Sequence, residues 1–112
     1  MPEMYNECRE YAKHVAEKIE AYYNGTANED GEEVSLYDYF ADALDYEAIL
    51  TSQKTVKSVR LYVTLGGPTC WVDTEDHAVV CHWGADQAEY PIDWDLCDEL
   101  EEMVSECMGL GR

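Results

Sequence analysis

Five cysteines and three histidines are the side chains in this chain that could ligate a metal ion. Cys70 and Cys81 are the best pair, because a hairpin would bring them opposite each other. His77 and His82 lie nearby in the sequence. The chain has no Cys-x-x-Cys pair and none of the usual zinc-ligand spacings. We therefore expect no metal and no other cofactor, although a small metal-binding protein stays open as an alternative.

The remaining cysteines, Cys8, Cys97 and Cys107, fall on apolar stripes of predicted helices, where cysteine behaves as a small buried hydrophobic residue. A nucleophilic thiol needs a cationic or helix N-terminal setting, and the acidic surroundings here work against it. The chain also lacks a phosphate-binding glycine loop and the Gly-x-Ser-x-Gly and His-Glu-x-x-His motifs. We predict buried free thiols, with a cross-strand disulfide as the alternative, and no enzymatic activity.

Carboxylates dominate the remaining chemistry, with 25 acidic against 7 basic side chains and a formal net charge of -18 on 112 residues. Solubility alone requires a net charge of only about 2 to 8 in a small domain, and a larger imbalance raises self-repulsion. Residues 29–47 contain eight acidic residues and no Lys or Arg. This charge predicts a basic protein surface as partner and disfavours direct binding to nucleic acid or to a membrane.

The elements that must position these carboxylates begin with two helices. Apolar residues at three- and four-residue steps predict a helix over about residues 3–23, followed by a polar loop over 26–33. Ser35 is a good N-cap for a short second helix. Asp38, Asp42 and Asp45 are three or four residues apart and would form one negative stripe on it.

The middle of the chain alternates between apolar and polar residues, which predicts strands at 46–51, 59–65, 69–73 and 78–83. The simplest register of the last two strands places Cys70 opposite Cys81 and Trp71 opposite Val80. Tyr62 and Trp71 would then share the sheet face that points away from the main apolar row. That face is either a binding patch or is covered by another helix.

The last segment predicts a helix over about residues 94–108, with Asp93 as N-cap and a stop at Gly109. Its outer face is acidic and has no Lys or Arg, although like charges one turn apart are mildly destabilising. The acidic residues of this face are Asp95, Asp98, Glu99, Glu101, Glu102 and Glu106.

Together these elements predict one α+β domain over residues 1–112, with two N-terminal helices, an antiparallel meander of three to four strands and a C-terminal helix. The 46% apolar content is sufficient for a core. No apolar run approaches the roughly 20 residues that span a bilayer, and the N-terminus does not resemble a signal peptide. We expect a cytoplasmic protein.

The segments 61–74, 81–84 and 88–92 contain turn glycines, core alternation and tryptophans. This pattern resembles small acidic proteins of unknown function from bacterial phages and mobile elements. Proteins of that general kind include anti-restriction and anti-CRISPR inhibitors, several of which are anionic mimics of DNA. The resemblance covers about the C-terminal half and implies no particular functional residues.

Taken with the charge, these features predict an acidic inhibitor that binds the nucleic-acid-binding surface of a host defence nuclease as a DNA mimic. The target would be a Cas9-type effector or a restriction system. The predicted partner-binding residues are Asp38, Asp42, Asp45, Asp95, Asp98, Glu99, Glu102 and Glu106, with Tyr62 and Trp71 as apolar anchors. One alternative is an adaptor or regulatory protein that uses the aromatic sheet face. In another, the charges simply solvate a small domain.

Overall fold

The computed structural model describes residues 2–26, 28–29, 32–33, 35–65 and 68–110. Its helices and the short N-terminal hairpin are α1 (Pro2–Asn24), β1 (Asn28–Glu29), β2 (Glu32–Glu33), α2 (Leu36–Ala41) and α3 (Trp94–Met108). Its main sheet consists of β3 (Asp45–Leu50), β4 (Val56–Thr64), β5 (Thr69–Asp73), β6 (Ala78–Trp83) and β7 (Asp86–Pro91). These five strands form an antiparallel meander in sequence order, which confirms the predicted α+β class.

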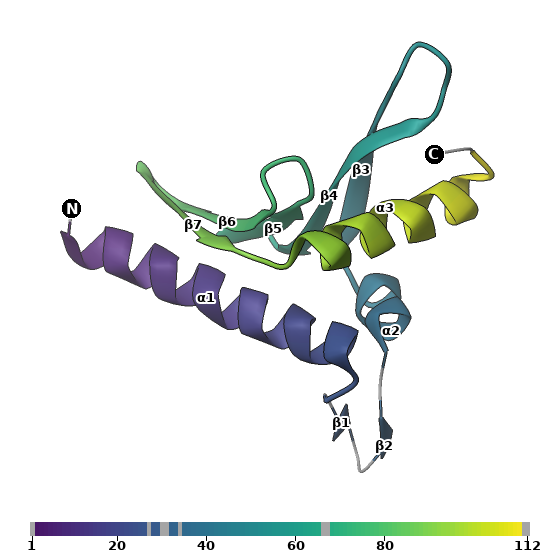
Figure 1. Ribbon diagram of the computed structural model, residues 1–112. Coiled ribbons are helices and arrows are strands. Elements are labelled where there is room, and N and C mark those ends of the chain that lie inside the picture. Colours follow the sequence, from purple (N-terminus) through teal and green to yellow (C-terminus); the bar gives the residue numbers. More distant parts are fainter. Residues whose placement is uncertain (1, 27, 30–31, 34, 66–67, 111–112) are drawn as a thin grey trace.

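Helices α1 and α3 lie on the same face of the main sheet (Figure 1). Helix α1 contacts β5, β6 and β7, whereas α3 contacts β4. The covered face contributes Val59, Leu61 and Val72 to one apolar core with Ile19 of α1 and Leu100 of α3. The strands alternate, so the neighbouring residues point to the opposite face of the sheet.

The register predicted for the third and fourth strands of the sheet is confirmed. Cys70 pairs with Cys81 and Trp71 pairs with Val80. The expected count of three to four strands was too low, because β7 forms a fifth strand against β6. β7 lies at the sheet edge, and Ala88 is its one fully buried residue. An edge strand with so little apolar content gives a weak sequence signal.

Helix α2 begins as predicted after the N-cap Ser35. It ends at Ala41, which is too early to include all three aspartates of the expected acidic stripe. Asp38 lies on the helix, Asp42 is its C-cap, and Asp45 is already the first residue of β3. The amide of Leu44 donates to the Tyr62 carbonyl at 3.0 Å, so the chain has left the helix to join β4. The prediction of one stripe formed by these three aspartates is therefore wrong.

The predicted loop after α1 contains a small antiparallel hairpin in which β1 pairs with β2. Residues 27, 30 and 31 of that loop lie outside the described residues, as do the predicted turn glycines at 66 and 67. None of the described helices has an apolar stretch long enough to cross a membrane.

Helix α3 has the predicted bounds and caps. The Asp93 side chain accepts a hydrogen bond from the Asp95 amide at 2.8 Å, and Gly109 ends the helix in the left-handed region at φ 68°. The Asp93 amide donates to Glu20 Oε2 at 3.3 Å, which ties the start of α3 to α1. The prediction for Cys107 was wrong: it lies in the last turn and is exposed, whereas Cys8 and Cys97 are buried.

Candidate functional site

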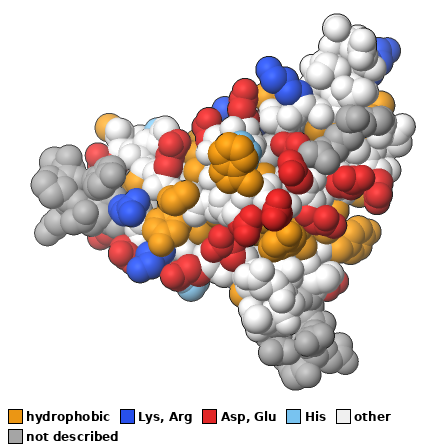
Figure 2. Space-filling view, viewed as in Figure 1, with side chains coloured by type: hydrophobic (Ala, Val, Ile, Leu, Met, Phe, Trp, Pro, Cys, Tyr) orange, Lys and Arg blue, Asp and Glu red, His pale blue; other side chains and the backbone are white. Residues whose placement is uncertain are grey.

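The outward side of α3 is an acidic face formed by Asp95, Asp98, Glu99, Glu102 and Glu106. All five residues are exposed, and each lies three or four residues from another member, which places them on one side of the helix. Leu96, Leu100 and Val104 anchor the opposite side in the core. Figure 2 shows acidic side chains gathered over this part of the molecule.

The spacing of charge along α3 is close to that of a nucleic acid backbone. The 15-residue helix carries six acidic residues, including the half-buried Glu101, and no Lys or Arg. At 1.5 Å per residue the helix is about 22 Å long, which gives one carboxylate about every 4 Å. One strand of B-DNA carries a phosphate about every 3.4 Å. Helix α3 as a whole therefore approaches the linear charge density of one DNA strand.

A groove of about 780 Å³ separates the end of α1, the start of α2 and the middle of α3. We call it the helical groove. Its described lining residues are Tyr22, Tyr23, Gly25, Ser35, Leu36, Tyr37, Asp38, Glu99 and Met103. Two predicted carboxylates from different elements, Asp38 and Glu99, therefore meet at one site. Burial and the neighbouring carboxylates, with Asp95 and Asp93 the strongest, raise the pKa of Tyr23.

The capping interactions of α2 fix Asp38 at the groove. Asp38 Oδ2 accepts hydrogen bonds from the Ser35 amide at 2.7 Å and from the Ser35 hydroxyl at 3.1 Å. These contacts hold the carboxylate at the N-terminus of the helix, where a negative charge is favourable. Asp38 is therefore positioned by the fold before any partner arrives.

The other two aspartates of the predicted stripe lie elsewhere. Asp42 lines a smaller cavity of about 150 Å³, which Lys18 and Tyr39 also line. Asp45 pairs with Tyr62 across β3 and β4, and its Oδ1 accepts a hydrogen bond from the Tyr46 amide at 2.8 Å. Neither residue contributes to the helical groove.

The predicted apolar anchors lie together on the sheet face turned away from α1 and α3. The rings of Tyr62 and Trp71 have centroids 6.0 Å apart, and both side chains are half-buried. The Arg60 guanidinium lies 5.5 Å from the Trp71 ring centroid. Tyr62 and Trp71 therefore form an aromatic sheet face with Arg60, on the side of the sheet opposite the acidic face of α3.

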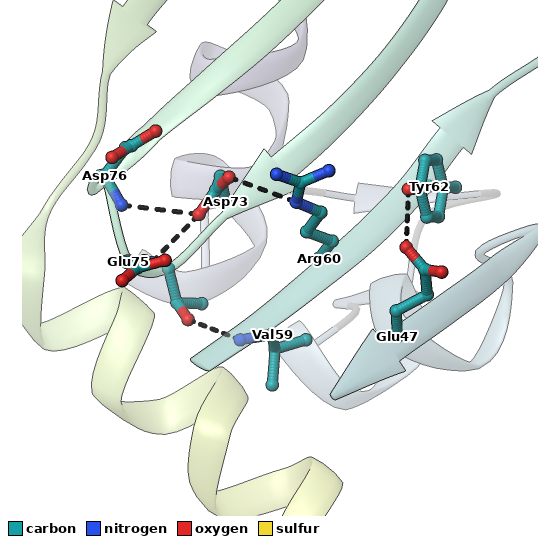
Figure 3. A network of polar contacts seen from close by, with 8 residues as sticks. Glu47, Val59, Arg60, Tyr62, Asp73, Glu75 and Asp76 are labelled. Carbon is teal, nitrogen blue, oxygen red and sulfur yellow. Dashed lines mark hydrogen bonds and ion pairs between the residues drawn. The ribbon is translucent and has the colours of Figure 1, made fainter. Parts of the chain in front are cut away.

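Polar contacts join the residues of this sheet face and the turn beside it (Figure 3). Arg60 Nε lies 3.4 Å from Asp73 Oδ2, and the Tyr62 hydroxyl donates to Glu47 Oε1 at 2.7 Å. The second bond is the main cause that raises the pKa of Tyr62. Asp73 Oδ1 also accepts from the amide of Glu75 at 3.0 Å. Among the described residues, no partner exists for the buried indole Nε1 of Trp71.

The candidate metal site does not assemble. Cys70 Sγ lies 2.9 Å from Cys81 Sγ on the helix-covered face, and both are free thiols, as predicted. His82 pairs with Thr69, so it belongs to the opposite face of the sheet. Burial, with the neighbouring Cys70 thiol, raises the pKa of Cys81. Within the described residues, no three His, Cys, Asp or Glu side chains come together to hold a metal ion.

Local sequence patterns do not single out three aromatic residues that lie near the acidic carboxylates. Trp94, the first residue of α3, is 69% exposed and stacks on His77 with ring centroids 3.9 Å apart. Tyr23 and Tyr37 line the helical groove. These residues lie at helix ends, where apolar periodicity does not distinguish a core residue from a surface residue.

Comparisons of the chain with protein-family models, with curated proteins and with solved structures each find no match. Three surfaces of the described residues are candidates for binding: the acidic face, the helical groove and the aromatic sheet face.

Proposed function

We propose that this protein is an acidic inhibitor that occupies the basic nucleic-acid-binding surface of a host defence nuclease, such as a Cas9-type effector or a restriction enzyme, as a DNA mimic. The observation that carries the proposal is the acidic face of α3, where carboxylates follow each other without any interspersed basic residue. Five like-charge pairs lie three or four residues apart on this face, and such pairs weaken a helix. A surface that served only stability would contain lysines at some of these positions.

The mechanism is the replacement of phosphates by carboxylates. Nucleases hold the DNA backbone with Arg and Lys side chains, which neutralise its phosphates. Helix α3 presents its carboxylates on a rigid element, because one side of the helix is anchored in the core. Little backbone conformational entropy is lost on binding, and the net charge of -18 accelerates encounter with a positive surface.

Capture of a purified target tests this function directly. Tagged protein is incubated with guide-loaded Cas9-type nuclease and, separately, with a restriction enzyme, and the bound fraction is eluted along a salt gradient. We expect one of these targets to be retained at low salt, to elute at moderate salt and to be displaced by duplex DNA. Retention that DNA does not displace, or no retention of either target, would contradict the mimic.

The aromatic sheet face supports a second candidate, an adaptor or regulatory protein. The observation in its favour is the half-buried pair of Tyr62 and Trp71 rings on the sheet face turned away from α1 and α3. Trp is a frequent anchor in interfaces. In that case Trp71→Ala abolishes capture, whereas charge reversal on α3 leaves capture nearly unchanged.

A further inference from the structure

The helical groove combines aromatic rings with carboxylates, which is the chemistry that recognises a guanidinium group. Tyr23 and Tyr37 are the aromatic residues of α1 and α2 that line it, and Tyr37 is 58% exposed. Met103 adds a flexible apolar surface on the α3 side. An arginine side chain has an apolar stem that lies well on such surfaces and a planar head that stacks on aromatic rings.

The charges of the groove select a cation. Asp38 and Glu99 approach it from two different helices, and none of its described lining residues is Lys, Arg or His. The acidic face of α3 continues from Glu99 along the helix on both sides. The groove is therefore an apolar cavity within a negative surface. It is complementary to a basic side chain with a long aliphatic stem.

We propose that the helical groove receives an arginine side chain of the protein partner, with the stem between Tyr23, Tyr37 and Met103 and the guanidinium between Asp38 and Glu99. This inference rests on the proposed function, because it assigns the point at which the basic partner is anchored. The acidic face of α3 supplies long-range attraction, and the groove supplies the specific contact. Arginine is favoured over lysine, whose compact ammonium group does not stack in this way.

An NMR titration tests the assignment on the intact chain. The protein is labelled with ¹³C at its methionine methyl groups, and an oligoarginine peptide is added. We expect the Met103 methyl signal to shift at low peptide concentration, because Met103 lines the groove. Met108 lies at the end of α3, is 40% exposed and does not line the groove, so it serves as an internal control. Equal shifts of both signals would show diffuse binding and overturn the proposal.

Peptide chemistry and matched variants sharpen the test. An oligolysine peptide of equal length should bind about two- to fivefold more weakly than oligoarginine, and Tyr23→Leu should remove most of this preference. Glu99→Gln should weaken oligoarginine binding about threefold, whereas Glu17→Gln, an equal charge change on the exposed side of α1, should change it little. Equal affinity for both peptides, or an equal loss of affinity in both Gln variants, would refute the proposal that the groove binds arginine.

The two proposals fail in different ways. If a nuclease is captured and displaced by DNA but Met103 does not respond to oligoarginine, the groove assignment is wrong and the mimic stands. If Met103 responds selectively but neither a Cas9-type nuclease nor a restriction enzyme is captured, the groove binds arginine and the nuclease function is wrong.

Discussion

The imidazole of His77 stacks flat on the indole of Trp94, with ring centroids 3.9 Å apart and ring planes 8° apart. His77 lies in the β5–β6 turn at a positive φ of 54°, and its carbonyl accepts a hydrogen bond from the Ile92 amide at 3.0 Å. These two contacts join the turn to the segment that enters α3. The pair therefore fixes the start of the helix that carries the acidic face.

Trp94→Ala should reduce the free energy of unfolding by about 1 kcal/mol, because a stacked aromatic pair contributes about 0.5–1.5 kcal/mol beyond area burial. Thermal unfolding followed by far-UV circular dichroism would show a melting temperature lower by a few degrees. Trp94→Phe keeps a ring over His77 and should recover most of the loss. Equal stability of both variants with the parent chain would mean that the stack does not anchor α3.

Charge reversal on α3 should disrupt capture of the basic partner. We expect Asp98→Lys with Glu102→Lys to weaken binding about tenfold or more at low salt and to make the remaining binding less salt-dependent. The control is Glu10→Lys with Glu17→Lys on exposed positions of α1, which alters net charge equally. If the two double variants lose affinity equally, net charge rather than the acidic face determines binding.

Glu106→Lys should stabilise the fold while it weakens the partner interaction. The change removes repulsion with Glu102 one turn away, creates an attractive pair there and places a cation at the negative end of the helix. We expect a gain of about 0.5–1 kcal/mol in urea unfolding, and about half of that for Glu106→Gln. A destabilised Glu106→Lys variant would show that other contacts determine the energy of this turn.

One thiol should react much faster than the others. Cys107 is exposed, whereas Cys8, Cys70, Cys81 and Cys97 are buried. With an aromatic disulfide reagent at mildly alkaline pH, we expect one equivalent to react rapidly and four to react after denaturation. Cys107→Ser should remove the fast phase. Rapid reaction of two or more thiols in the native protein would contradict the burial of the other four cysteines.

Stability should fall at alkaline pH because of buried thiols. Burial raises the pKa of Cys97 to about 12 from an ordinary value of 9.0. Between these values the unfolded chain has released the proton and the folded chain has kept it, so this group lowers the free energy of unfolding as pH rises. The slope is about 1.4 kcal/mol per pH unit for one group. Cys97→Ala should show a shallower decline from about pH 9 upward.

The sequence specified those elements whose signals are local and mutually consistent. The β5–β6 hairpin has matching apolar residues on both strands, so Cys70 and Cys81 could be paired in advance. Helix α3 has an N-cap aspartate and a terminal glycine, which define its bounds. The aromatic sheet face followed from the alternation of Tyr62 and Trp71 in paired strands.

The elements that were missed depend on long-range contacts. β7 is polar, and it forms a strand because its backbone pairs with β6 at the edge of the sheet. Helix α2 ends early because the backbone at Leu44 bonds to β4. Ala43 and Leu44 continue the helical apolar pattern in the sequence, but Leu44 is 58% exposed in the structure. The helical groove requires three helices to come together, so no local pattern could place Asp38 and Glu99 on the same groove.

The β3–β4 hairpin extends away from the helices, as Figure 1 shows, and Lys54 lies in its turn at a positive φ of 63°. Lys57 on β4 is close by in the sequence, so this end of the molecule carries positive charge, whereas α3 carries negative charge. The protein therefore has a permanent electric dipole, and the field of a cationic surface exerts a torque on it during approach. Helix α3 turns toward that surface and the hairpin turns away. A fluorophore or tether attached at Lys54 would remain at the trailing end and leave the docking side unobstructed.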